Sequence, residues 1–505
     1  MEQHNNTDSW QMPNGDAQYT SFSIGPKELI LALLMLIVGL LLCNSVIYSG
    51  FNLGFAIFAG LSLVCASGYL LWSGCRLTGY SATLLILSLI ILAGFARSND
   101  GFVKFVLVCF LLVSENLGLC LLAGQNRRPS DGVSSLLDAP RTLFSLGMGK
   151  LSATFHGLIQ AFRRSGTAGK KGGAILLGCC IAIPVLAILI PLLVSADAAF
   201  DALLQLLPEW DLSELYTTVV VGVFPTCVLY ARSIALKHSE KEATAPKAAR
   251  KGISPLTVNT VLTAVALVYG VYLASQLAYF SGGLLGILPE GYTMAQYARR
   301  GFFEMAWLCA INLGIIVLSI GLIAKEEKAP LSTRLLCLFI GIVTLFLVVT
   351  ASAKMFLYIR SYGLTRLRVL TEVIMLWFGI TTLLVSIWLF APRLPYMKAI
   401  LLSALVIGSS VLWADVDTVV AHYNVAAYQS GALEHVDINY LDRLGNSAVP
   451  YLQLLTKDRN PDIAKQATNL LRRQHISPAE DFRDWNYVNY VAGRLLSQDT
   501  VTDTP

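Results

Sequence analysis

Charged residues are scarce in this sequence. Only 14% of its 505 residues are Asp, Glu, Lys or Arg, whereas 55% are hydrophobic, and a soluble chain normally has about a quarter of its residues charged. Apolar runs of roughly twenty residues recur along the chain, and each is long enough to cross about 30 Å of hydrocarbon. The runs are uniformly apolar rather than amphipathic, which argues against the buried helices of a soluble protein. The sequence therefore predicts an all-α, polytopic helical membrane protein.

Motifs that would identify an enzyme or a metal site are also missing. There is no Gly-rich phosphate loop, nucleophile elbow, HExxH motif or kinase or ATPase signature, so a self-contained primary pump is disfavoured. The ten cysteines lie in or beside apolar runs, and their spacings resemble neither a zinc site nor a disulfide framework. We therefore predict no catalytic residue, metal or cofactor and favour a non-enzyme. Nothing resembles a nucleic-acid-binding fold, so nucleic acid is not an expected partner.

The apolar runs predict about eleven transmembrane helices, with ten to twelve as the range. Residues 1–27 are polar and are predicted to be a disordered cytoplasmic segment, too long and too acidic to precede a cleaved signal peptide. The first run is therefore a retained helix. The predicted spans are residues 29–48, 53–73, 81–96, 103–124, 174–194, 216–235, 256–280, 302–323, 335–353, 369–390 and 397–413.

These spans divide the chain into membrane regions and polar segments. Residues 28–124 form a four-helix N-terminal membrane region, and residues 125–173 form a basic, partly amphipathic loop. Residues 174–413 form a seven-helix membrane region, and residues 414–505 form a tail of short helices. In the tail, Asn460 and Pro461 predict a helix start.

Loop charge predicts the orientation. The loop 125–173 has eight Lys or Arg against two Asp, whereas residues 195–215 have five Asp or Glu and no Lys or Arg. Basic loops stay in the cytoplasm, so the acidic segment belongs outside. With eleven spans, the N-terminus is cytoplasmic and the C-terminal tail is extracytoplasmic.

One basic stretch conflicts with that rule. Residues 354–372, KMFLYIRSYGLTRLRVLTE, lie between two apolar runs at the predicted outer face yet carry four Lys or Arg. Arg368 and Glu372 are four residues apart, so on a helix they share a face and are expected to pair. A specific role for these charges is the simplest explanation of their position.

Other charges are predicted to join this stretch. Asp197 and Asp201 are four apart after the fifth span, and Arg299 and Arg300 precede the eighth. Arginine matches phosphate and carboxylate groups with a bidentate fork. The predicted outer-face binding residues are Arg299, Arg300, Arg360, Arg366, Arg368, Glu372, Asp197 and Asp201.

Within the fourth span, Glu115 is a separate candidate. Ionisable residues inside a membrane are costly, which makes them functional candidates. Alone, this carboxyl group would be protonated, because desolvation disfavours the charged form. It is predicted either to relay a proton or ion or to be a neutral carboxyl group hydrogen-bonded between helices.

Four motifs in order carry a family resemblance: SADAAFD, GYTMAQYARRGFFE, YIRSYGLTRLRVLTE and DINYLDRLGNSAVPYLQLL. Together they resemble the bacterial multi-pass membrane family catalogued as domain of unknown function 4173, which is related to family 4153. The resemblance covers residues 170–460. It implies a bacterial inner or plasma membrane location and supplies no catalytic residue.

The leading hypothesis is a membrane protein whose outer-face cluster binds an anionic lipid headgroup or an envelope component and acts in envelope sensing or regulation. Its expected partners are membrane lipids, an envelope component or another membrane protein. One alternative is a secondary transporter coupled through Glu115. A second is an enzyme on a lipid-linked substrate, with Asp197 or Asp201 as general base. A third reading is structural, with the arginines forming ion pairs that lock helix ends together.

Overall fold

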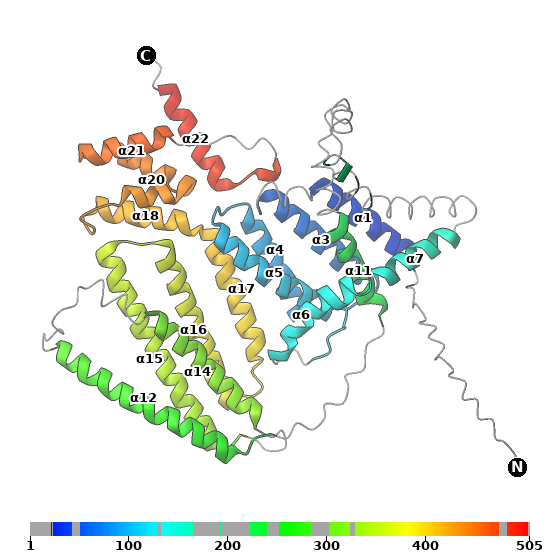
Figure 1. Ribbon diagram of the computed structural model, residues 1–505, viewed down its shortest axis with the longest axis horizontal. Helices are drawn as coiled ribbons and strands as arrows, with labels where there is room; N and C mark the ends of the chain where they lie inside the picture. Colours follow the sequence, from blue (N-terminus) through cyan, green and yellow to red (C-terminus); the bar gives the residue numbers. More distant parts are fainter. Residues whose placement is uncertain are drawn as a thin grey trace, which may run out of the picture.

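The computed structural model describes residues 24–42, 51–128, 133–164, 223–239, 252–284, 302–323, 329–473 and 482–502, and single residues 22, 185, 189, 192, 193 and 195. These residues form helices and their connections, without a β-strand. The chain is an all-α polytopic membrane protein. Its long helices, shown in Figure 1, are α1 (Pro26–Leu42), α3 (Leu53–Trp72), α4 (Gly79–Phe95), α5 (Gly101–Leu122), α11 (Phe224–His238), α12 (Pro255–Leu284), α14 (Phe302–Leu322), α15 (Leu331–Tyr362), α16 (Arg366–Phe390) and α17 (Tyr396–Ala414).

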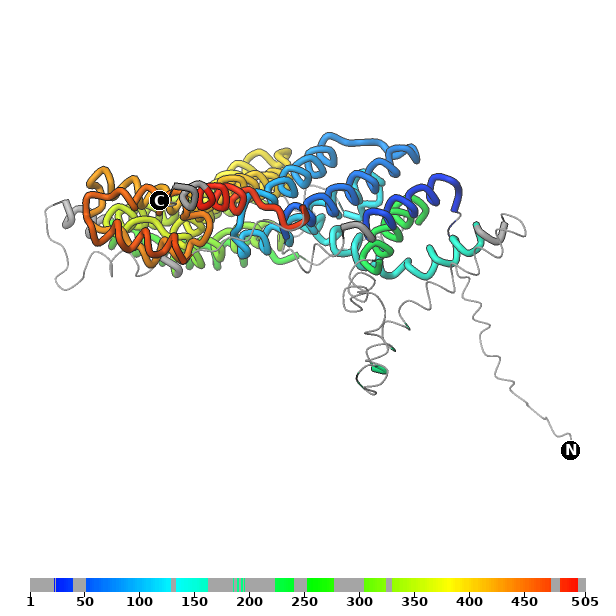
Figure 2. The backbone as a smooth tube through the Cα atoms, turned by 90° about the horizontal axis from the view of Figure 1, so that it is seen from above, coloured from blue at the N-terminus to red at the C-terminus, as the bar shows by residue number. Residues whose placement is uncertain are grey.

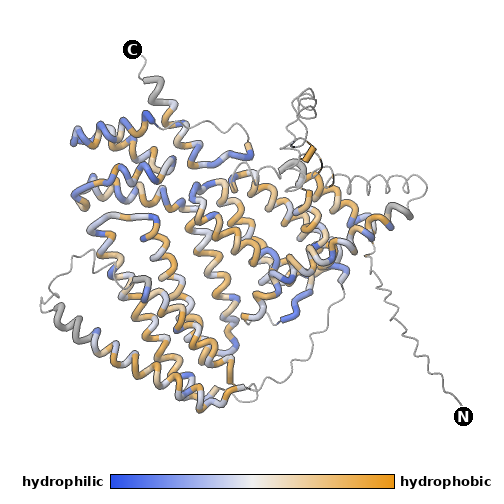
Figure 3. Tube along the Cα trace, viewed as in Figure 1, coloured by the Kyte–Doolittle hydropathy of each residue, from blue (hydrophilic) through white to orange (hydrophobic). Residues whose placement is uncertain are grey.

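Among the described helices, seven are long and apolar enough to cross a membrane: α3, α5, α12, α14, α15, α16 and α17. Helix α4 is apolar but shorter. The predicted span 174–194 falls almost wholly outside the described residues, and the predicted span 216–235 is described only from residue 223. Figure 3 shows the apolar character of the long helices.

The shorter helices lie in two places along the chain. Between α5 and α11 are η1 (Val133–Leu137), α6 (Asp138–Pro140), the π-helical segment η2 (Arg141–Met148) and α7 (Leu151–Arg164). After α17 come α18 (Val416–Gln429), α19 (Ile438–Arg443), η4 (Gly445–Ala448), α20 (Val449–Leu455), α21 (Pro461–Arg473), η5 (Phe482–Asp484) and α22 (Tyr487–Thr502).

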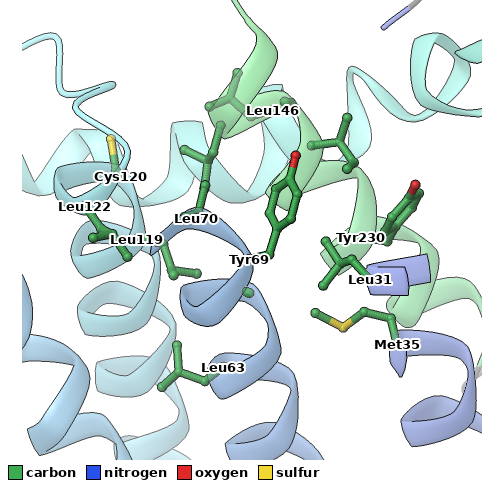
Figure 4. Packing of buried hydrophobic residues seen from close by; sticks show 14 of the residues in the cluster. Leu31, Met35, Leu63, Tyr69, Leu70, Leu119, Cys120, Leu122, Leu146 and Tyr230 are labelled. Atoms are coloured by element: carbon green, nitrogen blue, oxygen red, sulfur yellow. The ribbon is translucent and has the colours of Figure 1, made fainter. Parts of the chain in front are cut away.

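The long helices form two packed groups that α17 connects. Helices α1, α3, α4, α5 and α11 make one group, and α12, α14, α15 and α16 make the other, while α17 packs against both α4 and α16. Figure 4 shows how side chains of α1, α3, α5, η2 and α11 fill the first group, with Tyr69 and Tyr230 beside Leu31 and Met35. The connection through α17 makes the two groups one bundle.

The helices after α17 have a core of their own. Buried apolar side chains from α18 to α22 pack together, including Val420, Leu441, Leu452 and Ala467. The predicted helix start is confirmed, since α21 begins at Pro461 and the side chain of Asn460 accepts a hydrogen bond from the Asp462 amide at 3.0 Å. In Figures 1 and 2 these helices lie over one end of the bundle. We call that end the tail end and the opposite one the loop end.

The first helix group contacts the tail through hydrogen bonds and a cation–π pair. The amide of Tyr487 donates to the carbonyl of Ala96 at 2.8 Å, and the amide of Leu53 donates to the carbonyl of Trp485 at 3.3 Å. The guanidinium of Arg97 lies 4.8 Å from the centre of the Tyr487 ring, a cation–π distance. The start of α22 is thus fixed to the first group, while α18 follows directly from α17.

Candidate functional site

The turn between α15 and α16 shapes the tail end. Gly363 has φ 75°, in the left-handed region that glycine adopts without a Cβ penalty, and it ends α15. Asn424 of α18 clamps the next residue: its amide oxygen accepts from the Leu364 amide at 2.6 Å, and its amide nitrogen donates to the Leu364 carbonyl at 2.8 Å. The side chain of Thr365 then caps α16. The hydrogen bonds of Asn424 therefore hold the α15–α16 turn against α18 of the tail.

Arg366, the first residue of α16, is the centre of the site. Its Nε donates to Asp417 Oδ1 at 2.8 Å and its Nη2 to Asp417 Oδ2, which is a bidentate pair with α18. Its Nε also lies 3.2 Å from Asp100 Oδ2 at the start of α5. Its backbone amide donates to the Tyr440 hydroxyl of α19 at 2.9 Å. One residue thus ties α5, α16, α18 and α19 together.

The two carboxylates beside Arg366 are buried, and Arg366 is not. The side chain of Asp100 is fully buried and that of Asp417 is 4% exposed, whereas that of Arg366 is 39% exposed. Asp100 Oδ1 caps α5 by accepting from the amides of Phe102 and Val103 at 2.9 and 3.1 Å. Among the described residues, Nη1 of Arg366 has no hydrogen-bond partner. This nitrogen is the part of the cluster able to take a further acceptor.

Asp415 is a third buried carboxylate at the same place. Its oxygens accept from Ser98 Oγ and Ser447 Oγ, each at 2.9 Å, and from the Thr418 amide at 3.2 Å. Its φ of 53° is unusual for a residue with a side chain and costs of the order of 1–3 kcal/mol. The same carboxyl group caps α18 and joins the α4–α5 connection to the tail, and these hydrogen bonds offset that cost.

The charge balance of the cluster differs from the predicted one. Three buried carboxylates face Arg366 and the buried Lys104, whose Nζ donates to Asn52 Oδ1 at 2.8 Å. Burial raises the pKa of Asp417, and Asp100 and Asp415 act in the same direction, whereas Arg366 lowers it. In the described residues, the cluster therefore has more carboxylates than cations and is not a positively charged surface. Among the described residues of the cluster, Arg366 is the cation on the exposed side, and its charge is shared between two aspartates.

The expected pairing of Arg368 with Glu372 is wrong. The Nη1 of Arg368 donates to the Tyr362 carbonyl at 3.1 Å and to that of Gly363, and its guanidinium lies 4.0 Å from the centre of the Tyr358 ring. The C-terminal carbonyls of α15 lack intrahelical partners, and a cation stabilises them. Oε1 of Glu372 is instead buried without a hydrogen-bond partner among the described residues.

The remaining predicted residues do not join this cluster in the described structure. Arg360 is exposed at the end of α15. Arg299, Arg300, Asp197 and Asp201 lie outside the described residues. No group of three or more His, Cys, Asp or Glu side chains in the described ranges is placed to hold a metal ion.

Glu115 has a cationic partner that the sequence reasoning missed. Its Oε1 lies 2.8 Å from Nη2 of Arg232 on α11, and Nη1 of Arg232 donates to Asn116 at 2.9 Å. The Arg232 side chain is 1% exposed. Glu115 is thus not alone in the membrane, because a buried guanidinium lies beside it and compensates its charge. The feature of the sequence that could have predicted this partner is the single Arg, Arg232, within the predicted span 216–235.

An apolar groove begins directly below the cluster. It encloses about 220 Å³ between α5, α16 and α17. Its wall includes Phe102 and Val103, whose amides bind Asp100, and Leu370, one helical turn after Arg366. Farther along lie Trp377 and Gly408. The groove and the Arg366 cluster therefore lie next to one another on the same two helices, α5 and α16.

Residues 30–455 match the model of a family described as a domain of unknown function, 4153. This is the family related to the one that the motifs resemble, and the match begins much earlier, within α1. Comparison with curated proteins and with solved structures found no match. The matched segment runs from α1 to the end of α20, so it includes the whole Arg366 cluster and the groove below it.

Proposed function

The chain belongs to the family described as domain of unknown function 4153, and we propose that it binds a membrane phospholipid at the tail end. One acyl chain occupies the groove between α5, α16 and α17, and the headgroup phosphate contacts Arg366. The observation that carries the proposal is an apolar intramembrane groove whose lining begins one helical turn after a half-exposed arginine. The groove suits the apolar acyl chain of a phospholipid, and the arginine suits its phosphate.

The groove supports an acyl chain as its occupant. Its lining is almost wholly apolar, and all three of its helices are candidate membrane spans. An apolar groove on spanning helices is in contact with hydrocarbon, and lipid tails are the hydrocarbon available there. Its volume of about 220 Å³ accommodates part of one chain rather than a whole lipid.

Arg366 supports a phosphate as the polar end. Two of its three nitrogens are bound to Asp417, and Nη1 is left without a hydrogen bond among the described residues. Guanidinium groups bind phosphate oxygens with charge-assisted hydrogen bonds. A bidentate phosphate contact through Nη1 and Nη2 would compete with Asp417, because Asp417 already accepts from Nη2.

Competition between a lipid phosphate and Asp417 for Arg366 is the proposed sensing mechanism. Arg366 joins the spanning helix α16 to α18 through Asp417 and to α19 through Tyr440. A phosphate that draws Arg366 away from Asp417 weakens the attachment of the tail, so lipid occupancy is passed to the tail by contact. The proposed role is therefore envelope sensing or regulation, with the tail as the responding part.

We place the protein in a bacterial plasma membrane with the tail outside. The loop end supports this orientation, since basic residues of segments far apart in the sequence meet there: Lys27 donates to the Trp72 carbonyl, Lys237 to the Ser73 carbonyl and Arg141 to the Gln125 carbonyl. Clusters of Lys and Arg are typical of the cytoplasmic side.

Native mass spectrometry of the purified chain with a bound phospholipid tests the proposal. Arg366→Gln removes the phosphate contact and is expected to weaken lipid retention about tenfold, the effect of losing one charge-assisted hydrogen bond. Asp417→Asn breaks the same ion pair but frees Arg366, so retention is expected to stay equal or rise. A purely structural ion pair predicts the same effect for both variants, and that result would overturn the proposal.

The groove has its own matched pair of variants. Ala404→Phe fills the groove from α17 and is expected to displace the lipid. Val406→Phe adds the same ring on the exposed face of α17, away from the groove, and should leave retention unchanged. Equal lipid retention on wild type and Ala404→Phe would exclude the groove as the chain-binding site.

A further inference from the structure

The segment between α5 and α11 has apolar side chains on both of its faces. Towards the bundle, Ala139 and Leu146 are buried, and Leu146 belongs to the core shared by α1, α3, α5 and α11. The outward face is apolar as well. It carries four large hydrophobic side chains that are 46–58% exposed: Val133, Leu137, Phe144 and Met148. We call these four residues the exposed stripe.

The members of the exposed stripe share one side of a helical segment. The helices η1, α6 and η2 follow one another without interruption from Val133 to Met148. The stripe occupies positions 133, 137, 144 and 148, which are four, seven and four residues apart. Side chains at such intervals lie on one face of a helix. A contiguous apolar face is unfavourable in water and marks a surface that has a partner.

The position of η2 along α11 indicates that partner. A Cβ on Gly147 would lie 3.1 Å from Val228 Cγ1, so η2 packs directly on α11 there. Val228 is ten residues before His238, the end of α11, which corresponds to about 15 Å. That end lies close to the end of the spanning helix α3, since Lys237 Nζ donates to the Ser73 carbonyl. The segment, drawn in cyan beside α11 in Figure 1, therefore lies against the membrane-embedded part of the bundle.

Lipid acyl chains surround the bundle at this depth. Phe144 and Met148 lie on either side of Gly147 in η2 and are 58% and 47% exposed. Helices that lie along a membrane surface typically bury their apolar face about 5–10 Å into the boundary between headgroups and acyl chains. The depth of η2 and the apolar character of its outward face both match that arrangement.

The charge of the surrounding loop suits the same partner. Residues 125–173 contain eight Lys or Arg against two acidic residues, Asp131 and Asp138. The Asp138 carboxylate lies 3.2 Å from Arg128, so the loop keeps its positive excess even when both aspartates are paired. Basic segments beside a membrane are attracted to the anionic headgroups of the cytoplasmic leaflet.

We propose that η1, α6 and η2 form an interfacial anchor whose exposed stripe inserts into the leaflet at the loop end, among anionic phospholipids. The segment does not span the membrane; it lies along one face of it and holds the basic loop against the headgroups. The proposal does not rest on the lipid proposed at the tail end, because the stripe and the groove lie on different helices and share no residue.

Nitroxide labels on the full-length chain test the proposal, after reconstitution into vesicles of phosphatidylglycerol and phosphatidylcholine. Phe144→Cys and Leu137→Cys, each in a cysteine-free background, place the label on the stripe. Ser145→Cys is the matched control, since Ser145 is an exposed polar residue of the same turn. Paramagnetic resonance then compares collisions with oxygen, which concentrates in hydrocarbon, and with a nickel chelate, which stays in water.

Labels at Phe144 and Leu137 are expected to collide mainly with oxygen, and the label at Ser145 mainly with the nickel chelate. Nickel accessibility at Phe144 equal to that at Ser145 would place the stripe in water and overturn the proposal. Low accessibility of both stripe labels to both reagents would show that protein covers the stripe, either a second copy or another segment of the chain, and would also overturn it.

The preference for anionic lipid is tested by repeating the measurement in vesicles of phosphatidylcholine alone. Nickel accessibility at Phe144 is expected to rise by up to about fivefold, the equivalent of about 1 kcal/mol for one basic residue near an anionic surface. Equal accessibility in the two kinds of vesicle would overturn the anionic preference. Ala404→Phe, which fills the tail-end groove, should leave all these values unchanged, so the two proposals are tested separately.

Discussion

Arg366 and Asp417 are separated in sequence by the rest of α16 and all of α17, yet Nε of Arg366 donates to Asp417 Oδ1 at 2.8 Å. The pair joins the first residue of a spanning helix to the first turn of the tail. Its position makes the tail an extension of the bundle rather than an independent unit. It also gives the basic stretch 354–372 a partner that lies 45 residues or more away in sequence.

The first prediction concerns this attachment. Arg366→Gln and Asp417→Asn should each increase hydrogen exchange in α18 and α19, because each breaks the bidentate pair and leaves buried polar groups less well satisfied. Arg360→Gln, which changes an exposed arginine of the same stretch, is the control. Protection of α18 that is identical in wild type and both pair variants would show that the apolar tail core alone holds the tail in place.

The second prediction concerns the buried pair of Glu115 and Arg232. Glu115→Gln should cost about 3–5 kcal/mol of stability, because it leaves the guanidinium buried without its counter-charge. The double variant Glu115→Gln/Arg232→Met should be more stable than Glu115→Gln alone, since the uncompensated charge is gone. Thermal unfolding of the purified variants measures both effects. A double variant less stable than Glu115→Gln would contradict charge compensation as the role of Arg232.

The third prediction concerns the turn that positions Arg366. Gly363→Ala must adopt φ 75° and would place its Cβ 2.7 Å from Asn424 Oδ1, so it should lose more than about 1 kcal/mol and disturb the Leu364 clamp. Gly431→Ala is the matched control, because Gly431 has φ 77° but open space around its Cβ position. Equal melting temperatures for the two variants would mean that the contact with Asn424 contributes nothing.

The fourth prediction concerns the two membrane faces. In a cysteine-free background, single cysteines at Arg360 and Ser430 should react with a membrane-impermeant maleimide from the same side, because both lie at the tail end and are exposed. A cysteine at Arg393 should react only after the membrane is permeabilised. Labelling of Arg360 and Arg393 from one side would contradict the arrangement of α15, α16 and α17.

Part of the fold followed from local sequence. Long apolar runs must satisfy their backbone groups internally in lipid, so the spans α3, α5, α14, α16 and α17 could be predicted to within a few residues. The helix start at Pro461 followed equally from its capping residues. Boundaries were less certain where polar residues continue a helix: α15 extends to Tyr362, nine residues beyond the predicted end of its span. The basic residues near the end of this helix do not repeat with a helical period, so the pattern of the sequence did not predict where the helix ends.

The site depended on contacts between distant segments. The sequence by itself determined that residues 354–372 are basic, join two apolar runs and need compensating charges. It could not determine which carboxylates supply them, because Asp100 and Asp417 precede and follow Arg366 by several helices and only packing brings them together. For the same reason the sequence could not show that Glu115 pairs with Arg232. Arg368, by contrast, binds the carbonyls of Tyr362 and Gly363, only six and five residues before it. Local periodicity specifies helices and membrane spans, whereas long-range packing of those helices decides which charges meet.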